Sequence, residues 1–121
     1  MRSNDSAQPA PTHTDVCLWL DYYGELLSER QRQVLTLYYD EDLSLSEIAD
    51  VAGLSRQGVH GHIRKGVAKL MQFETTLRLA TRDGAIAERL SDALDHMGAD
   101  DAARQPIMDA LRMLGCSRRD A

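Results

Sequence analysis

The chain has 121 residues, enough for one compact domain with short appendages and too few for two ordinary domains. Hydrophobic residues make up 43% of the total, but no apolar run approaches the roughly 20 residues that span a bilayer, and the N-terminus has no signal-peptide core. This argues against a membrane protein and predicts a cytoplasmic location. The composition favours an all-helical fold, because only 5% of the residues are aromatic and alanine, leucine, arginine and aspartate are abundant. The net charge of −5 would argue against a nucleic-acid binder if it were evenly spread.

The N-terminal segment, residues 1–14, is predicted to be a disordered leader, because it is polar and Pro9 and Pro11 oppose regular structure. From Asp15, the expected N-cap, the pattern becomes helical. The apolar residues that define this first helix are Val16, Leu18, Trp19, Leu20, Tyr22, Tyr23, Leu26 and Leu27.

Two capping boxes predict the next two helices. In the first, Ser28 to Gln31, the serine hydroxyl can accept from the amide three residues on and the glutamine can reach back, so a second helix is expected to run to about Tyr39. The second box, Ser44 to Glu47, follows the acidic break Asp40-Glu41-Asp42 and predicts a short third helix at residues 46–51.

A glycine turn separates this helix from a fourth. Gly53 stands where a helix C-terminus requires a positive φ, and Ser55 supplies an N-cap for a helix beginning at Arg56. No strong breaker follows Phe73, so the helix is expected to continue towards Leu79. Its inner stripe is formed by Val59, Ile63, Val67 and Leu70.

The C-terminal third carries two further helical stripes. A new helix start is predicted near Asp83-Gly84, and a final helix with Pro106 in its first turn is expected to end at Gly115. The stripes are Ile86, Leu90, Leu94 and Met97, and then Ile107, Leu111 and Leu114. We therefore divide the chain into the leader, a helix-turn-helix domain at 15–80, C-terminal helices at 81–115 and a flexible tail at 116–121.

Charge is segregated along the chain, and the fourth helix holds the basic part. Residues 1–50 have three basic and ten acidic side chains (net −7), residues 51–73 have four basic and no acidic ones (net +4), and residues 74–121 have seven basic and nine acidic ones (net −2). A recognition helix needs an outer face without acids that donates to phosphates and bases, and this helix meets that requirement. Its candidate nucleic-acid-binding residues are Arg56, Gln57 and His60, near base edges, and Arg64, Lys65 and Lys69, near phosphates.

The combined motifs resemble the region 4 domain of bacterial sigma factors. The matching stretches are LSLSEIA at Leu43 to Ala49, LSRQGV at Leu54 to Val59, and Leu70. The resemblance implies an all-helical, sigma region 4-like bundle, here with a C-terminal helical extension.

A more particular resemblance is to the YlxM (UPF0122) family. It is carried by DYYGELL at Asp21 to Leu27, the pair Arg30-Gln31 and LYY at Leu37 to Tyr39, and it covers about residues 15–80. This resemblance implies a regulatory protein linked to the signal recognition particle pathway. The chain departs from the pattern by carrying Gly58, His60, Gly61 and His62 after the Ser-Arg-Gln start. Because glycine costs about 1 kcal/mol in a helix interior, Gly58, Gly61 and Gly66 are expected to weaken this helix.

Neither catalysis nor a cofactor is indicated. The chain has no glycine-rich phosphate loop and no pattern that sets a serine or cysteine beside a histidine, so an enzyme is not expected. Cys17 and Cys116 stand 99 positions apart without a Cys-x-x-Cys motif, and His60 and His62 point away from each other on a helix, so no metal site and no disulfide framework are predicted.

Two hypotheses for function stay open. The first is a nucleic-acid-binding regulator, with DNA favoured over RNA as the partner and a homodimer joined along a seam of Leu70, Phe73 and Leu77. The second is a protein-interaction adaptor that docks on the signal recognition particle or its receptor without binding nucleic acid, consistent with the overall acidity. The plain alternative for the basic residues is a solvated helix face.

Overall fold

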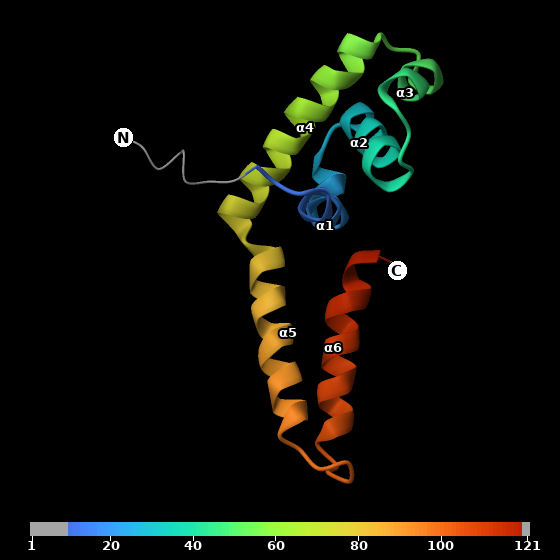
Figure 1. Cartoon of the computed structure of the whole chain (residues 1–121). Coiled ribbons are helices and arrows are strands. Elements are labelled where there is room, and N and C mark those ends of the chain that lie inside the picture. Colours follow the sequence, from blue (N-terminus) through green and yellow to red (C-terminus); the bar gives the residue numbers. More distant parts are fainter. Residues whose placement is uncertain (1–9, 120–121) are drawn as a thin grey trace. The chain divides into compact units, whose positions relative to one another are not determined.

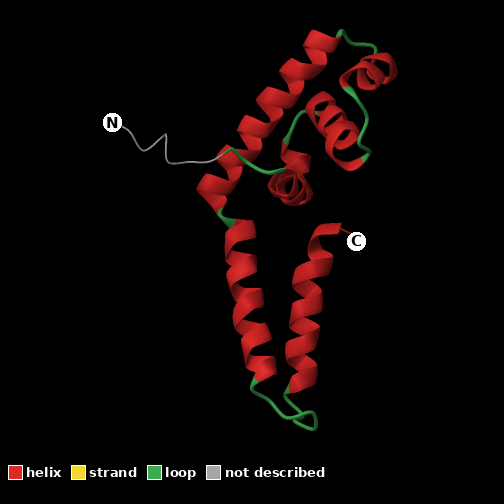
Figure 2. Cartoon of the chain, in the orientation of Figure 1, coloured by secondary structure: helices red, strands yellow, loops and turns green. Residues whose placement is uncertain are grey.

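The computed structural model describes residues 10–119, and within that range the side chains of residues 10–115. The described residues are helical and contain no strand, which confirms the all-helical expectation (Figures 1 and 2). The elements are α1 (His13–Tyr23), η2 (Gly24–Leu26), α2 (Glu29–Leu35), η3 (Thr36–Asp40), α3 (Leu45–Ala52), α4 (Arg56–Leu77), α5 (Leu79–Asp95) and α6 (Arg104–Arg119). None of these helices is long and apolar enough to cross a membrane.

The chain forms two compact units, Met1–Gln72 and Phe73–Ala121. The boundary lies inside the last turns of α4 and therefore earlier than the expected division at residue 80. The long fourth helix thus contributes residues to both units.

Helix α1 begins earlier than expected. Thr12, not Asp15, is the N-cap: its hydroxyl accepts from the Asp15 amide at 3.0 Å, while the Asp15 carboxylate accepts from the Thr12 amide at 3.1 Å. The prediction of Asp15 as the cap was wrong because Asp15 is the reciprocal member of a capping box that opens three residues earlier. His13 and Thr14, which were expected in the disordered leader, therefore belong to α1. Residues 1–9 of that leader lie outside the described residues.

Both predicted capping boxes are present. The Ser28 hydroxyl accepts from the Gln31 amide at 3.2 Å, and the Ser44 hydroxyl accepts from the Glu47 amide at 3.1 Å. The second helix remains helical to Asp40, but its last five residues, η3, form a single π-helical turn. Such a turn widens the helix by one residue and redirects the side chains that follow.

The core of the first unit lies where α2, α3 and α4 meet. Its buried cluster is Val34, Ile48, Ala49 and Val59. A second buried set, Val16, Leu20, Tyr23 and Leu27, comes from α1 and the turn after it. Of the predicted inner stripe of α4, Val59 and Leu70 are fully buried, while Ile63 and Val67 are half-buried.

Close packing in this unit depends on Gly66. A Cβ atom at this position would lie 2.7 Å from Cδ1 and 3.2 Å from Cγ of Leu35, which is itself fully buried. The glycine that seemed to weaken α4 thus lets α2 approach it closely, a role that its helix propensity does not reveal.

The break between α4 and α5 corrects one prediction. Helix α4 ends at Leu77 and α5 begins at Leu79, so no new start occurs at Asp83-Gly84, which lies inside α5. Arg78 takes the left-handed conformation (φ 56°) and separates the two helices without a glycine. The Glu74 carboxylate accepts from the amides of Ala80 and Thr81, and this capping from the preceding helix offsets the cost of Arg78.

The second unit is an antiparallel hairpin of α5 and α6 (Figure 1). Arg104 fixes its turn, because its Nη1 donates to the carbonyls of Leu94 at 3.0 Å and Met97 at 3.5 Å, at the C-terminus of α5. Helix α6 runs to Arg119, past the end predicted at Gly115, so residues 116–119 of the expected tail are helical. Pro106 does lie in the first turn of α6, as predicted.

Candidate nucleic-acid interface

Helices α3 and α4 form the predicted helix-turn-helix. Gly53 at the end of α3 is left-handed (φ 69°), and its amide donates to the Ala49 carbonyl, which also accepts from Leu54 at 3.0 Å. The Ser55 hydroxyl then accepts from the Gly58 amide at 2.9 Å and caps the N-terminus of α4. The predicted turn chemistry is therefore confirmed at both of its positions.

Arg30 holds α3 in place from α2. Its Nη1 donates to the carbonyl of Ala52 at 2.6 Å, a backbone group that the helix terminus leaves without an intrahelical partner. A cation here also faces the negative end of the α3 dipole. Sequence reasoning missed this residue, because only the tertiary fold brings positions 30 and 52 together.

All six candidate residues lie on α4, and all of their side chains are exposed. Residues four apart share a helix face, so the six form two adjacent rows. The first row is Arg56, His60 and Arg64, and the second is Gln57, Lys65 and Lys69. The rows cover nearly four turns of the helix, so their spacing is compatible with an element that follows a groove.

Gly61 lies in the second row, between Gln57 and Lys65, and a Cβ atom placed there would have no neighbour within 4 Å. The packing of this unit therefore does not require a glycine at this position. Without a side chain at this half-buried position, another molecule could approach the α4 backbone closely at the centre of the exposed face.

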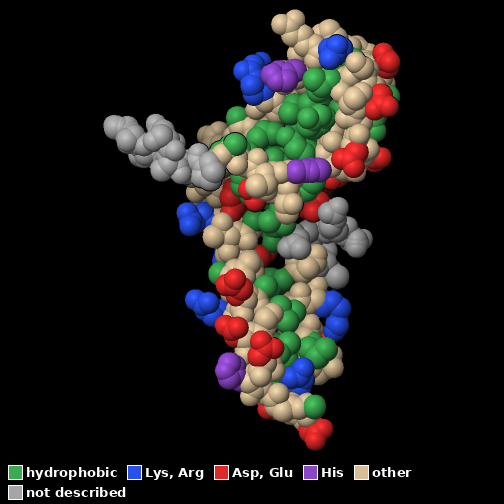
Figure 3. Space-filling model, in the orientation of Figure 1, with side chains coloured by type: hydrophobic (Ala, Val, Ile, Leu, Met, Phe, Trp, Pro, Cys, Tyr) green, Lys and Arg blue, Asp and Glu red, His purple; other side chains and the backbone are tan. Residues whose placement is uncertain are grey.

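The charged side chains on this face of α4 are all positive, and no carboxylate of a described residue neutralises them by an ion pair. Within the described residues, no carboxylate forms an ion pair with Arg56, Arg64, Lys65 or Lys69. Figure 3 shows basic side chains and a histidine at the upper end of the first unit, on the α4 side, and acidic side chains along the opposite edge. The basic and acidic side chains that the sequence places in different segments therefore also lie on different sides of the first unit.

The described residues hold no group of three or more histidine, cysteine, aspartate or glutamate side chains that could bind a metal ion. His60 is exposed and His62 half-buried on α4. Cys17, half-buried in α1, forms no disulfide within the described residues, and the side chain of Cys116 lies outside them.

Comparison with known proteins assigns this architecture a family. A family model described as "UPF0122: Putative helix-turn-helix protein, YlxM / p13 like" matches residues 13–110. A UPF0122 protein of Symbiobacterium thermophilum is 42% identical over 100 residues, 80% of this chain and 92% of its own. One from Acetivibrio thermocellus is 36% identical over 96 residues (79% and 82%), and one from Clostridium perfringens is 41% identical over 68 residues (56% and 61%).

Proposed function

Because this chain belongs to the UPF0122 family of helix-turn-helix proteins, we propose that it is a regulatory protein that binds nucleic acid through α4, with DNA as its preferred partner. The observation that supports this most directly is the pair of exposed rows on α4, which carry four basic side chains and no acidic one. In this proposal α3, fixed by Arg30, sets the angle at which α4 is presented.

The two ends of α4 have different roles in this proposal. Arg56, Gln57 and His60 occupy the first turns, the part of a recognition helix that reaches base edges. Arg64, Lys65 and Lys69 follow along the helix and neutralise phosphates, which positions the protein without reading sequence. Gly61 lets the groove wall approach the backbone between the two groups.

The test compares two double charge reversals of equal size. Arg64→Glu/Lys65→Glu removes two cations that would neutralise phosphates, and binding to a mixed-sequence 30-base-pair duplex, measured by fluorescence anisotropy, is expected to weaken at least tenfold. The slope of log K against log salt should also fall by about 2, close to one unit for each phosphate that is no longer neutralised. RNA duplexes of the same sequence measure the preference for DNA.

Arg82→Glu/Arg89→Glu is the matched control, because it makes the same change in net charge at exposed positions of α5. It should leave most of the binding intact. Equal weakening by both variants would attribute the effect to overall charge and remove α4 as the interface.

The alternative function is a protein-interaction adaptor for the signal recognition particle or its receptor, without nucleic-acid binding. The observation that favours it is the exposed acidic segment Asp40-Glu41-Asp42 on the first unit. A pull-down from native lysate, with and without nuclease, separates the two functions. A particle component that is still recovered after nuclease and by the Arg64→Glu/Lys65→Glu variant would favour the adaptor. Together with the absence of duplex binding by the wild type, it would contradict the regulator.

The regulator is further proposed to act as a homodimer, since paired helix-turn-helix units match two half-sites. The seam expected from the sequence needs one correction. Leu70 is fully buried and cannot contribute, whereas Leu77 is 47% exposed. The hairpin of the second unit offers further exposed apolar side chains, Ile86, Met108 and Met113.

A further inference from the structure

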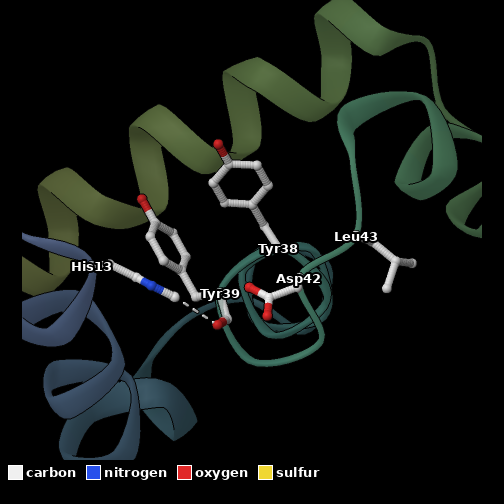
Figure 4. Close-up of a pocket in the computed structure, with 5 residues that line it drawn as sticks. All are labelled: His13, Tyr38, Tyr39, Asp42 and Leu43. Carbon is white, nitrogen blue, oxygen red and sulfur yellow. Dashed lines mark hydrogen bonds between the residues drawn. The ribbon is translucent and has the colours of Figure 1, made fainter.

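A cavity separate from the α4 face lies in the first unit, built around the π-helical turn η3. It has a volume of about 400 Å³ and is lined by His13, Tyr38, Tyr39, Asp42 and Leu43 (Figure 4). None of these residues takes part in the proposed nucleic-acid interface.

Aromatic faces and one carboxylate meet at this cavity. The Tyr38 and Tyr39 rings lie nearly perpendicular, at 84°, with centroids 5.0 Å apart. In Figure 4 both rings extend from the η3 turn, and the Asp42 carboxylate points back towards their bases while Leu43 points the other way. Tyr38 and Asp42 are exposed, so an incoming group can reach both.

The backbone holds this arrangement in an uncommon conformation. The Glu41 amide donates to the Thr36 carbonyl at 3.1 Å across the π turn, and the Leu43 amide donates to the Leu37 carbonyl at 3.0 Å. Between them Asp42 has φ 59°, the left-handed region that few residues other than glycine enter. The chain therefore directs the carboxylate towards the rings at a conformational cost.

The inner wall of the cavity is formed by Tyr39 and α1. His13 Nε2 donates to the Tyr39 carbonyl at 2.9 Å, and the two rings lie 5.2 Å apart. Cys17 Sγ also approaches this carbonyl, at 3.7 Å. Burial, and after it the neighbouring Tyr38 and Cys17, raises the pKa of Tyr39, which adds to the ordinary preference of its phenol for the neutral form near pH 7.

This combination is suited to a cation. Aromatic faces attract a positive group through their quadrupole, and a carboxylate beside them pairs with it directly. Arginine meets both requirements at once, because its planar guanidinium stacks on a ring while its edge donates two hydrogen bonds to one carboxylate. An ammonium group acts as a compact, strongly hydrated charge and cannot stack in this way.

We propose that the cavity between Tyr38, Tyr39 and Asp42 binds an arginine side chain presented by a protein partner. Exposed Asp40 and Glu41 continue the negative charge beyond the cavity. They would repel the phosphates of a nucleic acid and attract a basic peptide segment. The site is independent of α4, so it can be correct whether or not α4 binds nucleic acid.

The experiment uses the full-length protein and two short peptides. Acetyl-Gly-Arg-Gly-amide carries the guanidinium, and acetyl-Gly-citrulline-Gly-amide has nearly the same shape without the charge. Titration followed by ¹H–¹⁵N NMR should shift the amides of residues 38–43 and His13 with the arginine peptide only. An equal response to citrulline, or no response at these amides up to tens of millimolar arginine peptide, would overturn the proposal.

Asp42→Asn is the decisive variant, because asparagine tolerates the left-handed conformation and keeps the shape of the side chain while removing its charge. It should weaken arginine-peptide binding about fivefold or more, while Asp40→Asn, with the same charge change in the same turn, should change it less than twofold. Tyr38→Leu should also weaken binding, and Tyr38→Phe should retain most of it. If Asp40→Asn and Asp42→Asn have equal effects, general acidity and not this cavity attracts the peptide.

Discussion

At the scale of single residues, Glu74 shows how one side chain shapes the second unit. It is buried, yet its carboxylate is fully used: it accepts from the amides of Ala80 at 3.2 Å and Thr81 at 3.0 Å, and from the Thr81 hydroxyl at 2.5 Å. These donors open α5, where the helix dipole also favours a negative charge. Glu74 thus caps a helix to which it does not belong.

We therefore expect Glu74→Ala to destabilise the second unit by about 1–3 kcal/mol, because two backbone donors lose their acceptor. Glu88→Ala, an exposed change on α5, should cost less than about 0.5 kcal/mol. Urea unfolding gives the free energies, and amide hydrogen exchange at Ala80 and Thr81 localises the destabilisation. Unchanged exchange at those two amides would contradict the capping role.

At the scale of elements, α4 contains glycines with opposite roles. Gly66 faces α2, where a Cβ would meet Leu35 at 2.7 Å, whereas Gly61 faces outward with no neighbour within 4 Å of such an atom. Both lower the intrinsic helix propensity of α4 by about the same amount. Their contribution to the folded protein differs because only Gly66 is required by packing.

This contrast predicts opposite effects of one substitution on stability. Gly61→Ala should stabilise the protein by up to about 1 kcal/mol, because alanine is the better helix former. Gly66→Ala should destabilise it by about 1–3 kcal/mol, because the new methyl group overpacks against Leu35. The midpoint and slope of urea denaturation give the free energy of unfolding of each variant. A stabilising Gly66→Ala would show that α2 and α4 do not need this close approach.

Gly61→Ala also tests the interface separately from stability. If the backbone at Gly61 approaches nucleic acid closely, the more stable variant should bind the duplex more weakly. Improved binding would instead indicate that order in α4, and not access to its backbone, limits the interaction.

At the scale of the whole molecule, the two units differ in how well they bury apolar surface. The first unit has a core of three helices, to which α1 adds further buried side chains. In the second unit, the buried side chains among the described residues are those of Ala80 and Glu74. A hairpin of two helices buries too little to be stable by itself, so exposed groups such as Met113, 70% exposed, are expected to find a further apolar surface.

For the proposed homodimer, sedimentation velocity at tens of micromolar should detect a dimer. Met108→Asp/Met113→Asp should convert it to a monomer, because both side chains are exposed in the single chain and replacing them leaves its core unchanged. Val51→Asp, an equally exposed apolar position on α3, is the control and should leave the dimer intact. A wild type that stays monomeric throughout this range would exclude the dimer.

What the sequence determined by itself was local. The serine capping boxes, the left-handed Gly53 and the helical periodicity are each encoded within a few residues. The helix-turn-helix and the exposure of the six candidate side chains on α4 could therefore be predicted. The boundary at Arg78 could not, because no glycine or proline marks it and Glu74 makes it stable only once both helices exist.

Only the tertiary structure decided which residues meet across elements. Gly66 against Leu35, and Arg30 on Ala52, join positions more than twenty residues apart, and no local pattern specifies such a distance. The cavity of Tyr38, Tyr39 and Asp42 likewise depends on a π turn and a left-handed aspartate, neither of which the local sequence pattern predicted. Local interactions thus determine where most of the helices form, and packing between the helices determines which side chains come together.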